Sequence, residues 1–193
     1  MAQNKSKPHI AVIVGSNRKD SINRKLAQAL IALGRDSFDA EILKIDDFPL
    51  YNQDNEQNAP DNVKRFKAAV QAADGLLFVT AEHSRSIPAV LKNAIDWGAR
   101  PWGKNSWTGK IAAVTGTSAG AISTALAQQH LRQILGAQGV TLTGGEAYIQ
   151  FKPELIGVNG EFTDEATRKF LAGFLGNLTT LIARHAPAQG KAA

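Results

Sequence analysis

The stretch that decides the fold lies near the amino terminus and reads IAVIVGSNRKDSINRKLAQALIAL, from Ile10 to Leu33. Its first five residues, Ile10–Val14, form a continuous apolar run, which is typical of a strand buried on both faces of a parallel sheet. The polar segment Gly15–Asn23 follows. After it, apolar residues recur at helical spacing as far as Leu33. A strand, a loop and an amphipathic helix in this order are the repeating unit of an α/β fold.

The same alternation continues to the end of the chain. Four more strands are predicted at Glu41–Ile45, Gly75–Val79, Ile111–Val114 and, more weakly, within Val140–Ile149. A helix is predicted after each strand, and the five helices are expected at Asn23–Leu33, Pro60–Ala73, Pro88–Ala99, a segment ending near Leu135, and Asp164–Arg184. In the last helix, the spacing predicts an inner stripe of Phe170, Phe174, Leu178 and Leu181.

Five strands joined by right-handed crossovers favour one sheet order, 2-1-3-4-5. The expected architecture is therefore a flavodoxin-like three-layer α/β sandwich, a five-stranded parallel sheet with helices on both faces. A length of 193 residues suits one domain over 1–193, with flexible tails at 1–7 and 186–193. Ligands of such sheets bind outside the carboxyl ends of the strands. The loops that follow the buried strands are therefore the places to search for a site.

Composition removes several classes of function. The chain has no cysteine, which excludes disulfides, thiolate catalysis and cysteine-bound metals. Its four histidines lack metal-binding spacing, so no metal is expected. The net charge of +5 is spread along the chain without the clustering of a nucleic-acid surface. No apolar run spans a bilayer, and the first residues are polar, so we expect a cytoplasmic protein that binds neither membranes nor nucleic acids.

The first loop, Gly15–Asn23, carries what a phosphate ester needs. It supplies hydroxyl, amide and guanidinium groups from Ser16, Arg18, Ser21 and Asn23, and it leads into a helix N-terminus. Neither G-x-x-x-x-G-K-[ST] nor G-x-G-x-x-G is present, so the pattern favours a terminal phosphate over a pyrophosphate. As the alternative, Ser21 or Asn23 serves only to cap the helix.

The third loop, Gly116–Gly120, reads G-T-S-A-G and allows two interpretations. Its small residues permit a ligand to approach the backbone closely. It also matches the G-x-S-x-G nucleophile elbow, with Ser118, Asp164 and His185 in the chain order of a serine hydrolase. The position of His185 at the end of the last helix, and the unexplained donors of the first loop, weigh against hydrolysis.

The motifs at these loops resemble those of the NADPH-dependent FMN reductase family, in particular its bacterial quinone and chromate reductase branch. G-S-N-R-K-D-S-I-N at Gly15–Asn23 is similar to the family's G-S-x-R-x-x-S-x-N. S-I-P-A-V-L-K-N-A-I-D-W at Ser86–Trp97 is similar to S-x-P-G-x-L-K-N-A-I-D-W, and H-L-R-Q-I-L at His130–Leu135 also recurs in that branch. The resemblance covers Ile10 to Arg184.

The resemblance implies an enzyme that binds FMN without a covalent bond and transfers electrons from NADPH or NADH by a ping-pong mechanism. The implied acceptors are quinones, azo compounds, flavins or metal oxyanions such as chromate, and the implied assembly is a homodimer or homotetramer. It also implies the site residues: Ser16, Arg18, Ser21 and Asn23 at the FMN phosphate; Ala81, Glu82, His83, Ser84, Thr117, Ser118 and Gly120 around the flavin ring; and Arg100 toward NADPH or the acceptor.

One departure from the family pattern concerns the second loop. Many relatives read P-E-Y-N where this chain has Ala81-Glu82-His83-Ser84. Backbone contacts to the flavin do not depend on these side chains and are expected to be kept. Side-chain contacts to the flavin, and with them the acceptor preference, are expected to change. The alternative of another functional class is a flavodoxin-like electron carrier without NADPH turnover. Carriers of that kind are acidic, whereas this chain is basic.

Overall fold

The computed structural model describes residues 7–185. The main elements are β1 His9–Gly15, α1 Ile22–Gly34, β2 Asp39–Leu43, α2 Asp61–Ala72, β3 Gly75–Thr80, α3 Ala89–Ala99, β4 Ile111–Ser118, α4 Ala125–Ala137, β5 Thr141–Leu142, β6 Tyr148–Gln150 and α5 Glu165–His185. Two short 3-10 helices lie at Gln53–Asn58 and Pro153–Leu155. The tails predicted at 1–7 and 186–193 lie outside the described residues except for Lys7, whose ammonium group donates to Arg35 O (2.8 Å).

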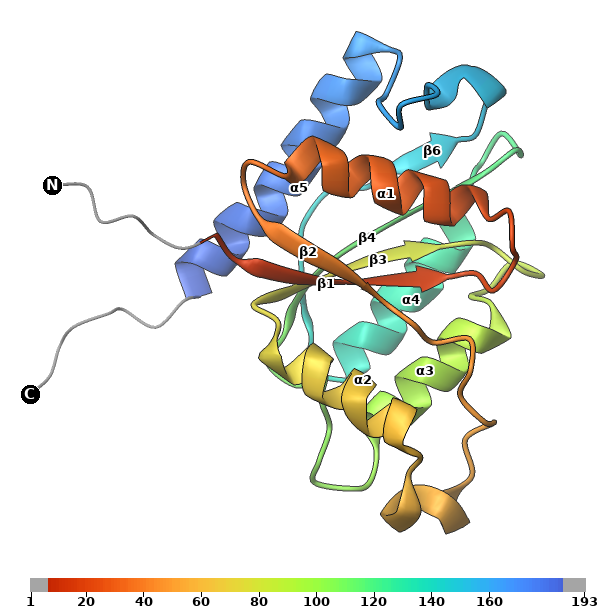
Figure 1. Cartoon of the computed structure of the whole chain (residues 1–193), viewed down its shortest axis with the longest axis vertical. Helices are drawn as coiled ribbons and strands as arrows, with labels where there is room; N and C mark the ends of the chain where they lie inside the picture. The colour runs from red at the N-terminus through yellow and green to blue at the C-terminus, as the bar shows by residue number, and fades with distance from the viewer. Residues whose placement is uncertain (1–6, 186–193) are drawn as a thin grey trace, which may run out of the picture.

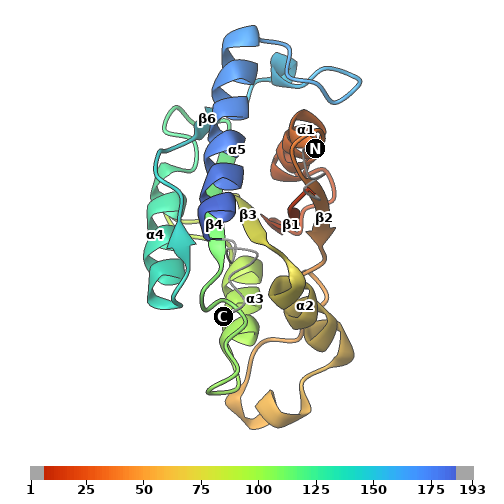
Figure 2. The same ribbon diagram turned by 90° about the vertical axis from the view of Figure 1, so that its left-hand side faces the viewer.

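The sheet is parallel, and its strand order β2-β1-β3-β4-β5 confirms the predicted 2-1-3-4-5 topology. Figure 1 shows α1 and α5 on one side of the strands and α2, α3 and α4 on the other. Figure 2, in which the molecule is turned by 90° about the vertical axis, shows α1 and α5 next to each other above the strands. The flavodoxin-like three-layer arrangement is therefore present.

Alternation along β1 divides the core between the two helical layers. Ile10, Val12 and Val14 pack with α1 and α5, whereas Ala11 and Ile13 pack with α2, α3 and α4. All five side chains are buried. Successive side chains of a strand point to opposite faces, so a strand covered on both faces must be apolar throughout. This explains why the apolar run at the start of the chain predicts the centre of the sheet.

The fifth position of the sheet differs from the single weak strand expected within Val140–Ile149. β5 pairs with the start of β4 and β6 with its end. Between them, the guanidinium of Arg132 donates to Thr143 O (3.0 Å) and Gly145 O (2.7 Å). These bonds tie the connection to α4, while Thr143 N still donates to Ala112 O of β4 (2.9 Å). The predicted single strand is therefore two short strands, Thr141–Leu142 and Tyr148–Gln150.

The inner face of α5 also differs in part from the predicted stripe. Phe174 and Leu178 are buried as expected, but Phe170 is 49% exposed and Leu181 only partly buried. The buried positions are Leu171, Phe174, Leu175, Leu178 and Ile182. The prediction for Phe170 was wrong because the spacing 170-174-178-181 fits a helix face almost as well as 171-175-178-182 does, and only the packing against the sheet selects between them.

Parallel pairing brings the ends of β1, β3 and β4 to the same edge of the sheet. Gly15 lies opposite Thr80, and Ala81 N donates to Gly15 O (3.2 Å). Val79 in turn lies opposite Thr115. The three loops singled out from the sequence therefore leave the sheet at the same edge. Within residues 7–185, no helix combines the length and the apolar character needed to cross a bilayer.

Candidate functional site

The loop after β1 presents a row of donors. For the backbone N–H groups from Asn17 to Asn23, the described part of the chain shows no acceptor. The side chain of Arg18 is exposed and, within residues 7–185, forms no ion pair or hydrogen bond. Successive N–H groups at a helix N-terminus form an anion-binding concavity, to which a guanidinium adds a full positive charge. The loop can therefore bind a phosphate group.

Two polar side chains of this loop already have partners. Ser21 Oγ accepts from Arg24 N (3.2 Å) and so caps α1, as the simpler interpretation of the sequence had it. Asn23 Nδ2 donates to Thr117 O, and Thr117 N donates to Asn23 Oδ1, each at 2.9 Å. Asn23 is 2% exposed. Its amide ties the first loop to the third, so Asn23 shapes the site instead of offering a free carboxamide to a ligand.

The loop after β3 turns tightly just above the sheet. His83 N donates to Ser86 O and Ser86 N to His83 O, both at 2.9 Å. The two residues between them have positive φ, +49° at Ser84 and +64° at Arg85. Two consecutive residues in the left-handed region define a type I′ turn. Ser86 does not cap α3, which is preceded by Pro88 and has no capping side chain; the Oγ of Ser86 lies 2.7 Å from His130 Nδ1, on α4.

The third predicted loop, Gly116–Gly120, overlaps the end of β4, which runs to Ser118, and its hydroxyl groups already have partners. Ser118 Oγ donates to Ser123 O (2.9 Å) and accepts from Gly120 N (3.3 Å). Thr117 Oγ1 donates to Ile149 O (2.6 Å), which links the loop to β6. Two residues before the end of β4, a Cβ on Gly116 would lie 2.0 Å from Thr80 O. Only glycine fits between β3 and β4 at this point.

The geometry excludes the serine hydrolase alternative. Asp164 accepts from Thr167 N (2.7 Å) and caps the start of α5, whereas His185 is the last residue of the same helix. At 1.5 Å per residue, the two lie about 30 Å apart. His185 Nδ1 lies 2.9 Å from Leu181 O of its own helix. Ser118, Asp164 and His185 therefore cannot form a triad.

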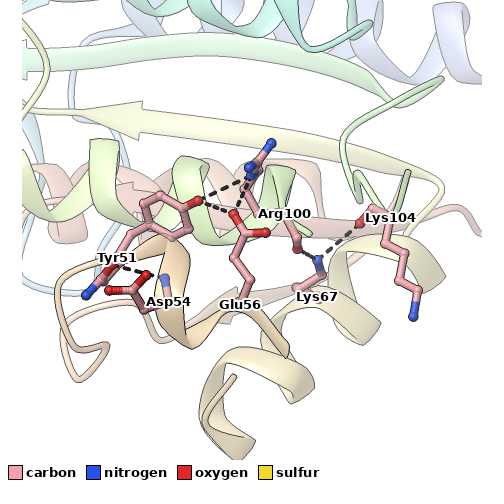
Figure 3. Close-up of polar contacts among 7 residues, drawn as sticks. Tyr51, Asp54, Glu56, Lys67, Arg100 and Lys104 are labelled. Atoms are coloured by element: carbon pink, nitrogen blue, oxygen red, sulfur yellow. Dashed lines mark hydrogen bonds and ion pairs between the residues drawn. The ribbon is translucent and has the colours of Figure 1, made fainter. Parts of the chain in front are cut away.

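Arg100 lies away from the three loops. It follows the last residue of α3, an eleven-residue helix that begins near the carboxyl edge, so about 16 Å of helix separates Arg100 from that edge. Figure 3 shows Arg100 facing Glu56 and Tyr51 of the segment between β2 and α2. Arg100 Nε lies 2.5 Å from Glu56 Oε1 and 3.2 Å from Tyr51 OH. The terminal nitrogens of Arg100 have no partner within residues 7–185.

This cluster also changes the acidity of its members. The hydrogen bond from Tyr51, followed by that from Arg100, lowers the pKa of the Glu56 carboxyl. The same contact with Glu56 raises the pKa of the Tyr51 hydroxyl. Beside them, Lys67 Nζ donates to Arg100 O and to Lys104 O (3.1 Å), and burial lowers its pKa. The cluster fixes the segment between β2 and α2 to the end of α3.

Two surface hollows lie elsewhere. One, of about 590 Å³, lies between α5 and the β5–β6 connection, and the other, of about 280 Å³, lies beside β2. None of the residues lining them belongs to the three loops. A hollow lined by Phe170, Lys169 and Gly145 lacks the row of donors seen after β1. Within the described residues, no group of three histidine, aspartate or glutamate side chains could hold a metal ion.

The parallel sheet and the donor-rich loop at its carboxyl edge define a flavin-binding α/β enzyme of the flavodoxin-like type. The chain belongs to the NADPH-dependent FMN reductase family, whose profile matches residues 8–154. FMN, with NAD(P)H as the electron donor, is the cofactor of this family. The free N–H groups and Arg18 fit its phosphate.

The relatives make the comparison more specific. A 2-hydroxy-1,4-benzoquinone reductase of Burkholderia sp is 46% identical over 167 residues, covering 86% of this chain and 91% of the relative. A quinone reductase of Pseudomonas putida is 43% identical over 175 residues, covering 90% of this chain and 94% of the relative. Among solved structures, the flavoenzyme NAD(P)H:(acceptor) oxidoreductase FerB of Paracoccus denitrificans has a TM-score of 0.89 at 45% identity and covers 92% of this chain and 98% of its own.

Sequence reasoning missed two features of the site. The first is that the carboxylate of Glu82 reaches α4, where Glu82 Oε2 accepts from Ala127 N (3.0 Å). The second is the contact between Ser86 and His130. Both contacts join segments more than forty residues apart, so local spacing carries no signal for them. The sequence contains one indirect signal for the Glu82 contact: the first turn of α4, which follows Thr124, has no acidic residue of its own.

Proposed function

We propose that this protein is an NAD(P)H-dependent quinone reductase that binds FMN across the three loops at the carboxyl edge of the sheet. The observation that carries the proposal is the row of N–H groups without acceptors from Asn17 to Asn23, with the unpaired Arg18 beside it. Bound FMN supplies a ring that takes two electrons from NAD(P)H and gives them to the acceptor.

The residues of the chain bind and orient this cofactor. In the proposal, the phosphate is bound by Arg18, Ser16 and the N–H groups of the first loop. Ser21 contributes its hydroxyl hydrogen, since its oxygen already accepts from Arg24 N. The ring lies between the second and third loops, formed by Ala81, Glu82, His83, Ser84, Thr117, Ser118 and Gly120. Asn23 sets the distance between the phosphate and ring parts of the site.

The proposed acceptor is a small quinone, since three relatives above 40% identity are quinone reductases. Azo compounds, free flavins and chromate belong to the wider proposal. The terminal nitrogens of Arg100 remain able to bind an anionic group of NADPH. Because α3 separates Arg100 from the three loops of its own chain, we place this contact in a homodimer or homotetramer, with Arg100 directed at a neighbouring site. A cytoplasmic location completes the proposal.

The test begins with purified protein reconstituted with FMN. We expect a yellow protein that retains flavin on gel filtration and oxidises NADPH or NADH when a benzoquinone is added. Flavin that stays bound without any NAD(P)H oxidation would favour the electron-carrier alternative. Failure to retain added FMN at all would refute the proposal. Sedimentation analysis of the same sample decides between monomer, dimer and tetramer.

A further inference from the structure

Helix α4 begins without a capping side chain of its own. Thr124 precedes its first residue but caps none of its N–H groups, and the first turn contains no acidic residue. Thr124 Oγ1 instead accepts from Gln128 Nε2 (3.0 Å). The first N–H groups of a helix lack intrahelical acceptors and require partners from elsewhere. At α4, one such partner comes from another loop.

That partner is Glu82, in the loop after β3. Its Oε2 accepts from Ala127 N (3.0 Å), in the first turn of α4, and its side chain is 8% exposed. A carboxylate is favoured at a helix N-terminus because it faces the positive end of the helix dipole. The other oxygen, Oε1, lies 3.2 Å from Arg85 Nη1. Glu82 thus connects α4 with a residue of the turn that follows it.

The turn needs this support, because Ser84 and Arg85 both have positive φ. Residues other than glycine and asparagine rarely adopt the left-handed backbone region, and each residue that does so requires stabilisation by its surroundings. A second contact ties the end of the turn to α4, since Ser86 Oγ lies 2.7 Å from His130 Nδ1. Residues 82–86 are therefore attached to α4 at both ends.

We propose that Glu82 is a positioning residue for the flavin ring. By capping α4 it holds residues 83–86 in the left-handed turn before the cofactor arrives, so that binding does not have to order this loop. The inference rests on the proposed function, in which this turn borders the ring. Preorganisation of a binding loop raises affinity because the conformational entropy has already been lost.

The variant Glu82→Ala removes both contacts. In FMN-free protein, we expect faster amide exchange at Ala127, and also at His83 and Ser86, whose N–H groups close the turn. In a fluorescence titration, we expect the Kd for FMN to rise about tenfold or more, the scale of losing a charged hydrogen bond. Glu82→Gln keeps an oxygen for Ala127 N and should remain within about threefold of the wild type.

A matched control is Asp164→Ala, which removes the carboxylate that caps α5 through Thr167 N (2.7 Å). It should lower the melting temperature much as Glu82→Ala does, yet leave the exchange at His83 and Ser86 and the Kd for FMN unchanged. This separates positioning from general stabilisation. Arg85→Ala, which keeps the cap but removes the exposed ion pair, should behave like Glu82→Gln.

Unchanged exchange at His83 and Ser86 in Glu82→Ala would overturn the proposal, because the turn would then hold itself. Faster exchange with an unchanged Kd for FMN would also overturn it, because the conformation of the turn would not matter to the flavin. If the wild type itself bound no FMN, the proposed function would fail first. The exchange measurements would then decide separately whether Glu82 holds the turn.

Discussion

The side chain of Asn23 pairs with both backbone groups of Thr117, donating to its carbonyl oxygen and accepting from its N–H at 2.9 Å each. Asn23 lies in the first turn of α1 and Thr117 near the end of β4. Ninety-four residues separate them along the chain. A single buried amide thereby fixes the distance between the loop proposed to bind the FMN phosphate and the loop proposed to border the ring.

Replacing Asn23 by alanine should destabilise the protein by about 2–4 kcal/mol, because two buried backbone groups of Thr117 lose their partners. Gln28→Ala, an exposed substitution on the same helix, is the control and should change stability by less than about 0.5 kcal/mol. Urea denaturation of the FMN-free proteins measures both values. Equal stabilities for the two variants would show that the amide pair contributes nothing to the fold.

Arg18→Ala should weaken FMN binding by about 1.5–3 kcal/mol, the range for a hydrogen bond to a charged group. The stability of the FMN-free protein should not change, because the Arg18 side chain is exposed and has no partner in the described residues. The matched variant is Lys19→Ala, an exposed cation one residue further on. Equilibrium titration with FMN compares them, and an Arg18→Ala affinity equal to that of the wild type would remove Arg18 from the phosphate site.

Gly116→Ala should destabilise the protein by about 1–3 kcal/mol through overpacking. Its Cβ would lie 2.0 Å from Thr80 O, so β3 and β4 must separate at the carboxyl edge. Gly136→Ala, in α4, is the opposite case, because its Cβ would meet no atom within 4 Å. There we expect a gain of up to about 1 kcal/mol from helix propensity. Thermal or urea denaturation gives the sign of each change, and two changes of equal sign would contradict the packing argument.

The contribution of Glu56 to stability should depend on pH. Tyr51 and Arg100 lower its pKa from the ordinary value of 4.5, so the carboxylate stabilises the folded state above about pH 4.5 and loses this effect as the pH falls through the folded pKa. The stability difference between the wild type and Glu56→Gln should therefore be constant from pH 7 to pH 5 and shrink below about pH 4.5. Urea denaturation at several pH values tests this. A stability difference between the two proteins that grew as the pH fell would contradict the prediction.

Local sequence was sufficient for the order of the main elements from β1 to α4. The apolar run Ile10–Val14 identified the central strand, because a strand covered on both faces has no polar side of its own. The loops at Gly15–Asn23 and Gly116–Gly120 could be placed at one edge from the topology of parallel strands alone. The family resemblance in those loops then indicated FMN, and the match over residues 8–154 confirms the family.

Other properties were decided only by tertiary structure. The pairing of β5 and β6 with opposite ends of β4 was visible only in the structure, and the exclusion of a Ser118 triad depends on the length of α5. Spacing along the chain describes which side chains share a face of one element. Whether a hydroxyl or carboxylate is free for a ligand depends on partners from distant segments, as with Asn23 and Glu82. The sequence by itself therefore determined the sheet and its binding edge, and packing between elements determined which polar groups remain available there.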